Sequence, residues 1–191
     1  MRPAVRSPNV SHVETGQFGV FLALVENQES TPIPRSAGRV LVINPEGRVL
    51  MLQGFDPADP ERRYWITFGG GLDDGERPAE AAARELREEA GIKATAADLV
   101  GPVWRRDTEF SFAGVRYAQQ EEYYVLHVGQ VQVCMDDMEE IERETVTGYR
   151  WWSLDELAAT DEPFFPAEMP ELLSSLATGA LPRISGGRGT S

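Results

Sequence analysis

Short apolar runs, bounded by Pro, Gly and charged residues, recur along the chain after residue 37 and predict β-strands. They lie at 39–44, 48–53, 64–68, 99–106, 108–112, 115–128 and 147–152. Pro45-Glu46-Gly47 separates the first two runs, so a hairpin is expected there, and Ala113-Gly114 predicts a turn between two later strands. The polar segment 55–63 with its two prolines predicts a loop, and the three glycines at 69–71 are expected to end the strand before them.

One segment between these strands has the periodicity of an amphipathic helix, from about residue 77 to residue 90. Pro78 suits the first turn, where its missing N–H leaves no bond unmade, and Gly91 is placed to end the helix. On a helical wheel the carboxylates of Glu85, Glu88 and Glu89 share one arc, and a stripe of alanines and one leucine lies beside that arc. The small side chains of this stripe would let the helix approach a sheet closely.

The C-terminal half predicts shorter helices, at 153–159 with a serine cap and at 166–177, and the acidic segment 132–144 predicts a loop or a short helix. Strands on both sides of a central helix, followed by further helices, indicate an α/β fold, a sandwich rather than a repeating βαβ unit. We expect one domain at 37–178, an N-terminal arm at 1–36 and a flexible tail at 179–191. Within the arm, Thr31–Pro34 predicts an extended linker, and Phe18–Val25 a possible extra strand or dimer contact.

Composition narrows the classes of partner. The 191 residues are 41% hydrophobic, which is enough for a core, and carry a formal net charge of −13. This charge argues against a nucleic-acid partner and suggests that a phosphate substrate needs metal ions as intermediaries. Cys134 is the only cysteine, so no intramolecular disulfide forms, and the eight apolar residues of Phe18–Val25 are too few to span a bilayer. We expect a soluble, cytoplasmic protein that does not act on membranes.

The chemistry of the acidic helix follows from its three carboxylates. Left alone they would repel one another and raise one another's pKa, and a divalent cation removes that repulsion. Carboxylate oxygens suit Mg²⁺, with Mn²⁺ as a substitute, and Mg²⁺ commonly shares its site with substrate phosphates. The preceding glycines allow the backbone to approach such a site, and Arg84 can hold a carboxylate by a fork of hydrogen bonds. Together these features predict metal-assisted attack of water on a phosphate.

A simpler alternative is a solvated helix face stabilised by i,i+4 pairs such as Glu80–Arg84 and Arg84–Glu88. The spacing over the whole segment decides against it. The chain satisfies G-x5-E-x7-R-E-U-x-E-E-x-G-U, where U is a bulky aliphatic residue, and average residue usage gives a chance match on the order of one in a billion per starting position. The matching positions are Gly70, Glu76, Arg84, Glu85, Leu86, Glu88, Glu89, Gly91 and Ile92.

This segment resembles the Nudix box, the signature of the Nudix hydrolases, at every fixed position from Gly70 to Ile92. The resemblance implies an α/β/α sandwich with a mixed sheet. It also implies Mg²⁺-dependent hydrolysis of the diphosphate linkage in a nucleoside diphosphate joined to another group. The substrate would be a small nucleotide, either a nucleoside triphosphate or a nucleotide sugar such as ADP-ribose.

By matching positions, the resemblance implies roles for the residues of the box. Glu85, Glu88 and Glu89 would be metal ligands, with Glu88 also part of the catalytic group, and the carbonyl of Gly69 would be a further ligand. Glu76 and Arg84 would brace the loop against the helix. One position departs from the family, since Phe68 stands where a proline often precedes the glycines.

The general base is sought outside the box. Glu121 and Glu122 lie in a predicted strand and face opposite ways, so one of them can point towards the metal site, and Glu121 is preferred. The alternative for each is an exposed carboxylate on a strand. Glu139, Glu140 and Glu142 in the acidic segment are the competing candidates.

Substrate contacts are expected from Arg62 and Arg105, which lie near the ends of predicted strands and could hold a phosphate, and from Trp65, which could stack on a base. Solvated arginines and core packing are the alternative interpretations. A different function, a catalytically idle module that senses a nucleotide, stays open at this point, as does a homodimer formed through the N-terminal arm.

Overall fold

A computed structural model describes residues 31–179, so the possible strand at Phe18–Val25 and the tail after residue 179 lie outside the described residues. The strands are β1 (Ile33–Ile43), β2 (Val49–Asp56), β3 (Asp59–Ile66), β4 (Phe68–Gly71), β5 (Val100–Phe112), β6 (Val115–His127), β7 (Val146–Trp152) and β8 (Phe164–Phe165). The α-helices are α2 (Pro78–Ala90), α3 (Glu140–Thr145), α4 (Leu154–Ala159) and α5 (Met169–Ala177), with a 3₁₀ turn at Ala96–Asp98. No helix between residues 31 and 179 is both long and apolar enough to cross a membrane.

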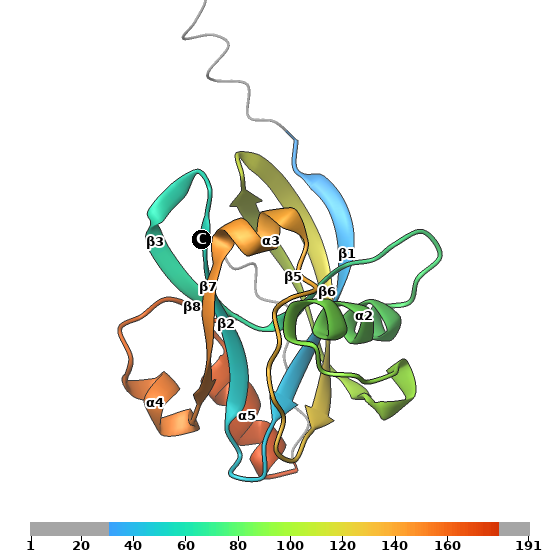
Figure 1. The fold of residues 1–191 in the computed structure, drawn as a ribbon, viewed down its shortest axis with the longest axis vertical. Helices are drawn as coiled ribbons and strands as arrows, with labels where there is room; N and C mark the ends of the chain where they lie inside the picture. The colour runs from blue at the N-terminus through green and yellow to red at the C-terminus, as the bar shows by residue number, and fades with distance from the viewer. Residues whose placement is uncertain (1–30, 180–191) are drawn as a thin grey trace, which may run out of the picture. The chain divides into compact units, whose positions relative to one another are not determined.

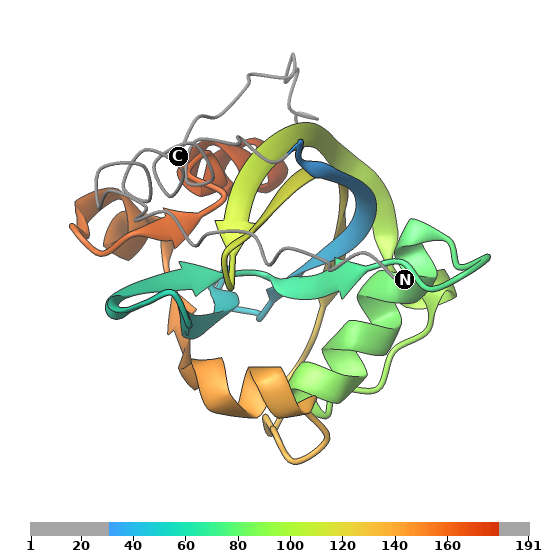
Figure 2. The same cartoon turned by 90° about the horizontal axis from the view of Figure 1, so that it is seen from above.

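The eight strands between residues 31 and 179 belong to one mixed sheet, as the family resemblance implies. Its strand order is β5-β6-β1-β2-β3-β8, with β4 also paired to β1 and β7 to β2. β1 runs parallel to β6 and antiparallel to β2 and β4. The sheet curls, with α2 and α3 on one side and α4 and α5 on the other (Figures 1 and 2).

The alternation of side chains along the central strands divides the core in two. Val40 and Val42 of β1 pack with Leu86 of α2 in a first cluster. Leu41, the residue between them, points to the opposite face and packs in a second cluster that includes Leu172 of α5. The sheet is therefore covered on both faces, which is the predicted sandwich.

Helix α2 begins and ends as predicted. Pro78 is its first residue, and Gly91 ends it in the left-handed conformation with a φ of 66° and an N–H donated to the Arg87 carbonyl, 2.9 Å away. The expected close approach to the sheet is also present. A Cβ on Gly38 of β1 would overlap the Pro78 carbonyl, so the backbone of the helix lies directly on the strand.

The prediction that glycines 69–71 end a strand is wrong. With Phe68 they form β4, whose register pairs Arg39 with Gly69 and Ala37 with Gly71. Gly69 has a φ of 116°, and a Cβ there would overlap the Gly38 carbonyl, so this strand needs glycine to fit against β1. Glycine at this position allows β4 to approach β1 closely.

Three further boundaries differ from the sequence predictions. The expected linker Thr31–Pro34 contributes to β1, which starts at Ile33 and pairs there with β6. The expected loop 55–63 holds the end of β2 and most of β3. The expected pair of strands at 99–106 and 108–112 is the single strand β5. These segments have exposed polar faces and lack an apolar pattern. They are strands because they form hydrogen bonds to neighbouring strands.

The acidic segment 132–144 is a loop up to Glu139 and continues into the short helix α3, so each of the two expected structures occurs in part of it. Ser153 caps α4 as expected, and its hydroxyl accepts from the Glu156 N–H at 3.2 Å. The last helix, α5, starts at Met169 instead of residue 166, and the short strand β8 before it was not foreseen.

Candidate active site

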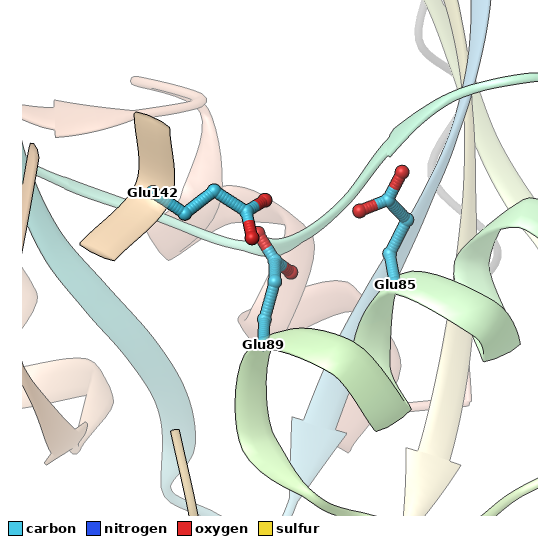
Figure 3. Close-up of side chains that lie close together, drawn as sticks. All are labelled: Glu85, Glu89 and Glu142. Atoms are coloured by element: carbon cyan, nitrogen blue, oxygen red, sulfur yellow. The ribbon is translucent and has the colours of Figure 1, made fainter. Parts of the chain in front are cut away.

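Three carboxylates from two helices meet beside β4. Side-chain oxygens of Glu85, Glu89 and Glu142 all lie within 4.8 Å of one another (Figure 3). Glu85 and Glu89 are one turn apart on α2, and Glu142 comes from α3, more than fifty residues later in the chain. We call these three residues the carboxylate group.

Glu89 is the most deeply buried of the three, with 8% of its surface exposed. Its Oε2 accepts the backbone N–H of Gly69 at 2.9 Å, which ties the helix to β4. Burial raises the pKa of Glu89 well above its ordinary value, and the charges of Glu85 and Glu142 raise it further, against the opposing effect of the Gly69 hydrogen bond. Ionisation of Glu89 beside two other carboxylates is costly in free energy, and a bound cation would lower this cost.

Glu85 is fixed from both sides. Its carboxylate lies against Gly70, where a Cβ would overlap it, so a larger residue there would displace this carboxylate. Its Oε1 also accepts from Arg84 Nη1 at 3.0 Å. Burial raises the pKa of Glu85, although the charge of Arg84 opposes this effect.

Arg84 connects the helix to the loop before it. Its Nε and Nη2 donate to the two oxygens of Glu76, both at 3.1 Å, and Nη2 also donates to the Gly71 carbonyl at 2.9 Å. The hydrogen bonds from Arg84 lower the pKa of Glu76, so this pair stays ionised. The fork of Arg84 thereby holds β4, the loop and α2 in one arrangement.

Glu88 and the carbonyl of Gly69 have other partners in this arrangement. Glu88 accepts from Arg84 Nη1 at 3.1 Å and from Arg87 Nη2 at 2.8 Å. The Gly69 carbonyl accepts from Arg39 Nη1. Their predicted roles as metal ligands stay predictions.

Glu121, the preferred general base, lies on the other face of β1 and β6, beside Tyr123 of the second core cluster. It accepts hydrogen bonds from Arg39 at 3.1 Å, Gln119 at 2.6 Å, Arg106 at 2.6 Å and Tyr123 at 2.7 Å. Burial alone would raise its pKa, but Arg39 and Arg106 outweigh burial and lower it to about 2. Glu121 therefore acts as the counter-charge of the buried Arg39 and the half-buried Arg106, and its role as a base stays a prediction.

Glu142 was only one of three competing candidates in the acidic segment. Helix α3 begins with a capping box in which the Glu139 N–H donates to Glu142 Oε2 at 2.9 Å. This bond leaves the other oxygen of Glu142 for the carboxylate group. Burial raises the pKa of Glu142, as do the charges of Glu139 and Glu88. The capping spacing was visible in the sequence, whereas the contact of α3 with α2 was not.

The three predicted substrate contacts lie outside the carboxylate group. Arg62 is exposed on β3. Arg105 is exposed on β5 and pairs with Glu122 at 2.8 Å. Trp65 is 7% exposed, lies in the second core cluster, and its indole N–H donates to Glu162 at 2.7 Å. The packing of Trp65 is that of a core residue.

Residues 32–173 match the NUDIX domain, which covers most of the chain and includes β1 to β8. The chain belongs to the Nudix family. The match begins one residue before β1 and ends within α5, so the helix–loop arrangement described above is the Nudix box in its structural context.

Two curated relatives differ in name and are matched over part of their length. An RNA pyrophosphohydrolase from Bartonella quintana is 42% identical over 71 residues, which are 35% of this Nudix chain and 40% of that protein. An octanoyltransferase from Myxococcus xanthus is 33% identical over 99 residues, which are 49% of this chain and 27% of that protein. The chain thus spans well under half the length of these curated relatives.

Solved structures show the same fold. The crystal structure of a MutT protein from Methanosarcina mazei Go1 superposes with a TM-score of 0.56 at 19% identity, covering 78% of this chain and 96% of the other. At this identity the likeness concerns the fold alone, a mixed curled sheet with its helices.

Proposed function

We propose that this Nudix protein is a metal-dependent pyrophosphohydrolase that cleaves the diphosphate linkage of a nucleoside diphosphate joined to another group. The carboxylate group carries the proposal. It places one carboxylate oxygen each of Glu85, Glu89 and Glu142 within 4.8 Å of the others, next to β4, whose Gly70 lies against the carboxylate of Glu85. Such a constellation in a Nudix box suits hydrolysis of a phosphate anhydride.

The donor set fits a hard divalent cation. It consists of carboxylate oxygens, and no His or Cys joins the group among residues 31–179. Burial raises the pKa of Glu85 and of Glu89, and a bound cation would stabilise the ionised form of both carboxylates. Mg²⁺, or Mn²⁺ in its place, is the cation that such oxygens prefer, and when bound it activates water and offsets the charge of the phosphates.

Glu85 and Glu89 would hold the cation, and Glu88 and the Gly69 carbonyl would complete its ligands after exchanging their arginine partners. Glu76 and Arg84 position these groups, because the fork of Arg84 joins Glu76, Gly71, Glu85 and Glu88. Arg62 and Arg105 are solvent-exposed and stay candidates for contacts with the outer part of the substrate.

We assign the general base to Glu142. Its carboxylate is within 4.8 Å of the two α2 carboxylates, whereas every oxygen of Glu121 is engaged by buried arginines and their neighbours. A base must reach the attacking water with a free lone pair, and Glu142 has one oxygen outside its capping bond. Geometry thus favours the residue that the sequence ranked lower.

Glu142→Gln is expected to lower kcat by about 10²–10³-fold, which is the usual contribution of a positioned base. KM and the affinity for Mn²⁺ should change by less than about threefold, since Glu85 and Glu89 stay in place. Glu144→Gln, an exposed glutamate on the same helix, is the control. Steady-state kinetics of the two variants test the assignment, and a Glu142→Gln enzyme with normal kcat would contradict it.

Two substrate classes are compatible with the site. The name of the Bartonella relative points to the 5′ end of an RNA. The net charge of −13 would repel the rest of an RNA chain, which favours a small nucleotide. A catalytically idle sensor would be expected to have lost metal carboxylates, and all three of the Nudix box are present.

The proposal is tested by incubating the full-length protein with Mg²⁺ or Mn²⁺ and a panel of nucleoside triphosphates, dinucleoside polyphosphates, ADP-ribose and 5′-triphosphorylated RNA. Release of phosphate, pyrophosphate or nucleoside monophosphate from at least one of them, abolished by EDTA, is expected. Binding of a nucleotide without turnover of any compound would instead identify the sensor.

A further inference from the structure

Arg35 of β1 lies next to the carboxylate group on the other side of the glycine strand. Its guanidinium carbon is 3.8 Å from the position that a Cβ would take on Gly71. The neighbouring residue, Gly70, lies against the carboxylate of Glu85. Consecutive residues of a strand face opposite ways, so Arg35 and Glu85 lie against neighbouring residues of β4 on its two opposite faces.

Among residues 31–179, no Asp or Glu forms an ion pair with the guanidinium of Arg35. Its Nε donates to the side-chain oxygen of Gln119, and Gln119 in turn donates its amide to Glu121 at 2.6 Å. The acceptor-only carboxylate fixes the amide, so that its oxygen faces Arg35. Between residues 31 and 179, Nη1 and Nη2 of Arg35 find no protein acceptor, whereas every other arginine there that is not exposed pairs with Asp or Glu. These are Arg39, Arg48, Arg84, Arg106 and Arg116.

Two aromatic rings lie against the guanidinium of Arg35. Phe110 of β5 and Tyr117 of β6 are stacked, with ring centroids 5.5 Å apart and planes inclined by 29°. The Arg35 guanidinium carbon is 4.9 Å from the centroid of Tyr117 and 5.8 Å from that of Phe110. Rings support a cation without using its N–H donors, so the two terminal nitrogens stay available to a ligand.

Burial lowers the pKa of Arg35, and the like charge of Arg39 lowers it further. An oxyanion on Nη1 and Nη2 would offset both effects. Guanidinium forks bind phosphate oxygens in pairs, and the nearest place where phosphate is expected is the carboxylate group across Gly70 and Gly71.

We propose that Arg35 binds a phosphate of the substrate that lies beyond the two joined by the scissile bond, and so selects substrates with a triphosphate end over nucleotide sugars with a diphosphate. This inference rests on the proposed hydrolysis at the carboxylate group. Acidic side chains can hold phosphates only through cations, so the next phosphate along the chain needs a positive group from the protein. Arg35 supplies that group, and the Phe110–Tyr117 pair and Gln119 position it.

Binding of inorganic phosphate chains to the full-length protein, measured by calorimetry with Ca²⁺ in place of Mg²⁺, tests the inference separately from turnover. Wild-type protein is expected to bind tripolyphosphate at least about tenfold more tightly than pyrophosphate, which is the contribution of a charge-assisted contact. Arg35→Gln should abolish this preference and leave pyrophosphate affinity within about threefold. Arg48→Gln removes the same charge from a surface pair with Glu156 and should keep the preference.

Steady-state kinetics then test whether Arg35 contacts the substrate. Arg35→Gln should raise KM for the triphosphate substrates of the panel by about tenfold or more and leave the kinetics of ADP-ribose-type compounds unchanged. Equal affinity of wild-type protein for the two phosphate chains, or equal losses on both in Arg35→Gln, would overturn the inference. If Arg35→Gln loses the preference for tripolyphosphate but the wild-type protein hydrolyses none of the compounds, the proposed hydrolysis is contradicted and the phosphate-binding role of Arg35 is supported.

Discussion

Glu89→Gln is expected to reduce metal-dependent hydrolysis by about a thousandfold or more. A metal ion contributes several kcal/mol of charge stabilisation to the transition state, and each 1.4 kcal/mol is a tenfold change in rate. Glu89 is the buried member of the carboxylate group and is anchored to β4 through the Gly69 N–H. Replacing its carboxylate by an amide removes a negative ligand at the point where the helix and the glycine strand meet.

The same variant should stay folded. The amide oxygen of glutamine can still accept the Gly69 N–H, and a neutral amide costs less to bury than a charge. Because burial raises the pKa of Glu89 in the folded state, ionising this residue destabilises the metal-free protein increasingly as the pH rises above the ordinary glutamate value of about 4.3. At neutral pH without metal, the unfolding temperature of Glu89→Gln should equal or exceed that of the wild type. Glu46→Gln, in the exposed β1–β2 turn, is the control for both measurements.

Glu121→Gln is expected to have the largest effect on stability, a loss of about 3–5 kcal/mol in the free energy of unfolding. The substitution leaves the buried Arg39 and the half-buried Arg106 without their shared counter-charge. Denaturant unfolding followed by circular dichroism measures the loss. The matched control is Glu122→Gln on the same strand, which breaks a pair with the exposed Arg105 and should cost no more than about 1 kcal/mol.

The pH dependence of stability gives a second sign of the same role. The pKa of Glu121 is lowered to about 2 in the folded protein, below its value of about 4.3 in the unfolded chain. Its contribution is therefore fully present above about pH 4.3 and is lost as the pH falls towards 2. Glu121→Gln should flatten this part of the stability curve. A variant that loses activity but keeps wild-type stability would instead support Glu121 as the general base.

The part of the site that lies in one helix could be predicted from the sequence because its signals are local. Pro78 and Gly91 mark the ends of α2, and the wheel places Glu85 and Glu89 on one arc. The spacing from Gly70 to Ile92 then led to the Nudix family. Each of these inferences needs only residues within about twenty positions of one another.

The remainder depends on contacts between distant segments. The sequence pattern predicts a strand end at the glycines of β4, because their close contacts are with Gly38 on another strand and Glu85 on the helix. The position of Glu142 depends on where α3 packs, and the free donors of Arg35 depend on which neighbours β5 and β6 place around it. The periodicity of the sequence does not predict such contacts between distant segments.

Glu121 shows the limit of strand alternation. The alternation of strand residues predicts that Glu121 and Glu122 face opposite ways, which is correct. It does not predict which of the two faces carries the arginines that surround Glu121. Arg39 and Arg106 lie more than sixty residues apart, and both converge on Glu121. A carboxylate that resembled a base in the sequence is the centre of a buried ion network in the fold.

The central claim is that Glu85 and Glu89 of the carboxylate group hold a divalent cation that is required for hydrolysis. Its most direct test is the hydrolysis rate of the best substrate as Mn²⁺ is titrated into wild-type protein and Glu89→Gln side by side. We predict saturation of the wild-type rate with Mn²⁺, reversal by EDTA, and a rate at least about a thousandfold lower in the variant at every concentration. Equal rates in the two proteins, or hydrolysis that persists in EDTA, would contradict the account.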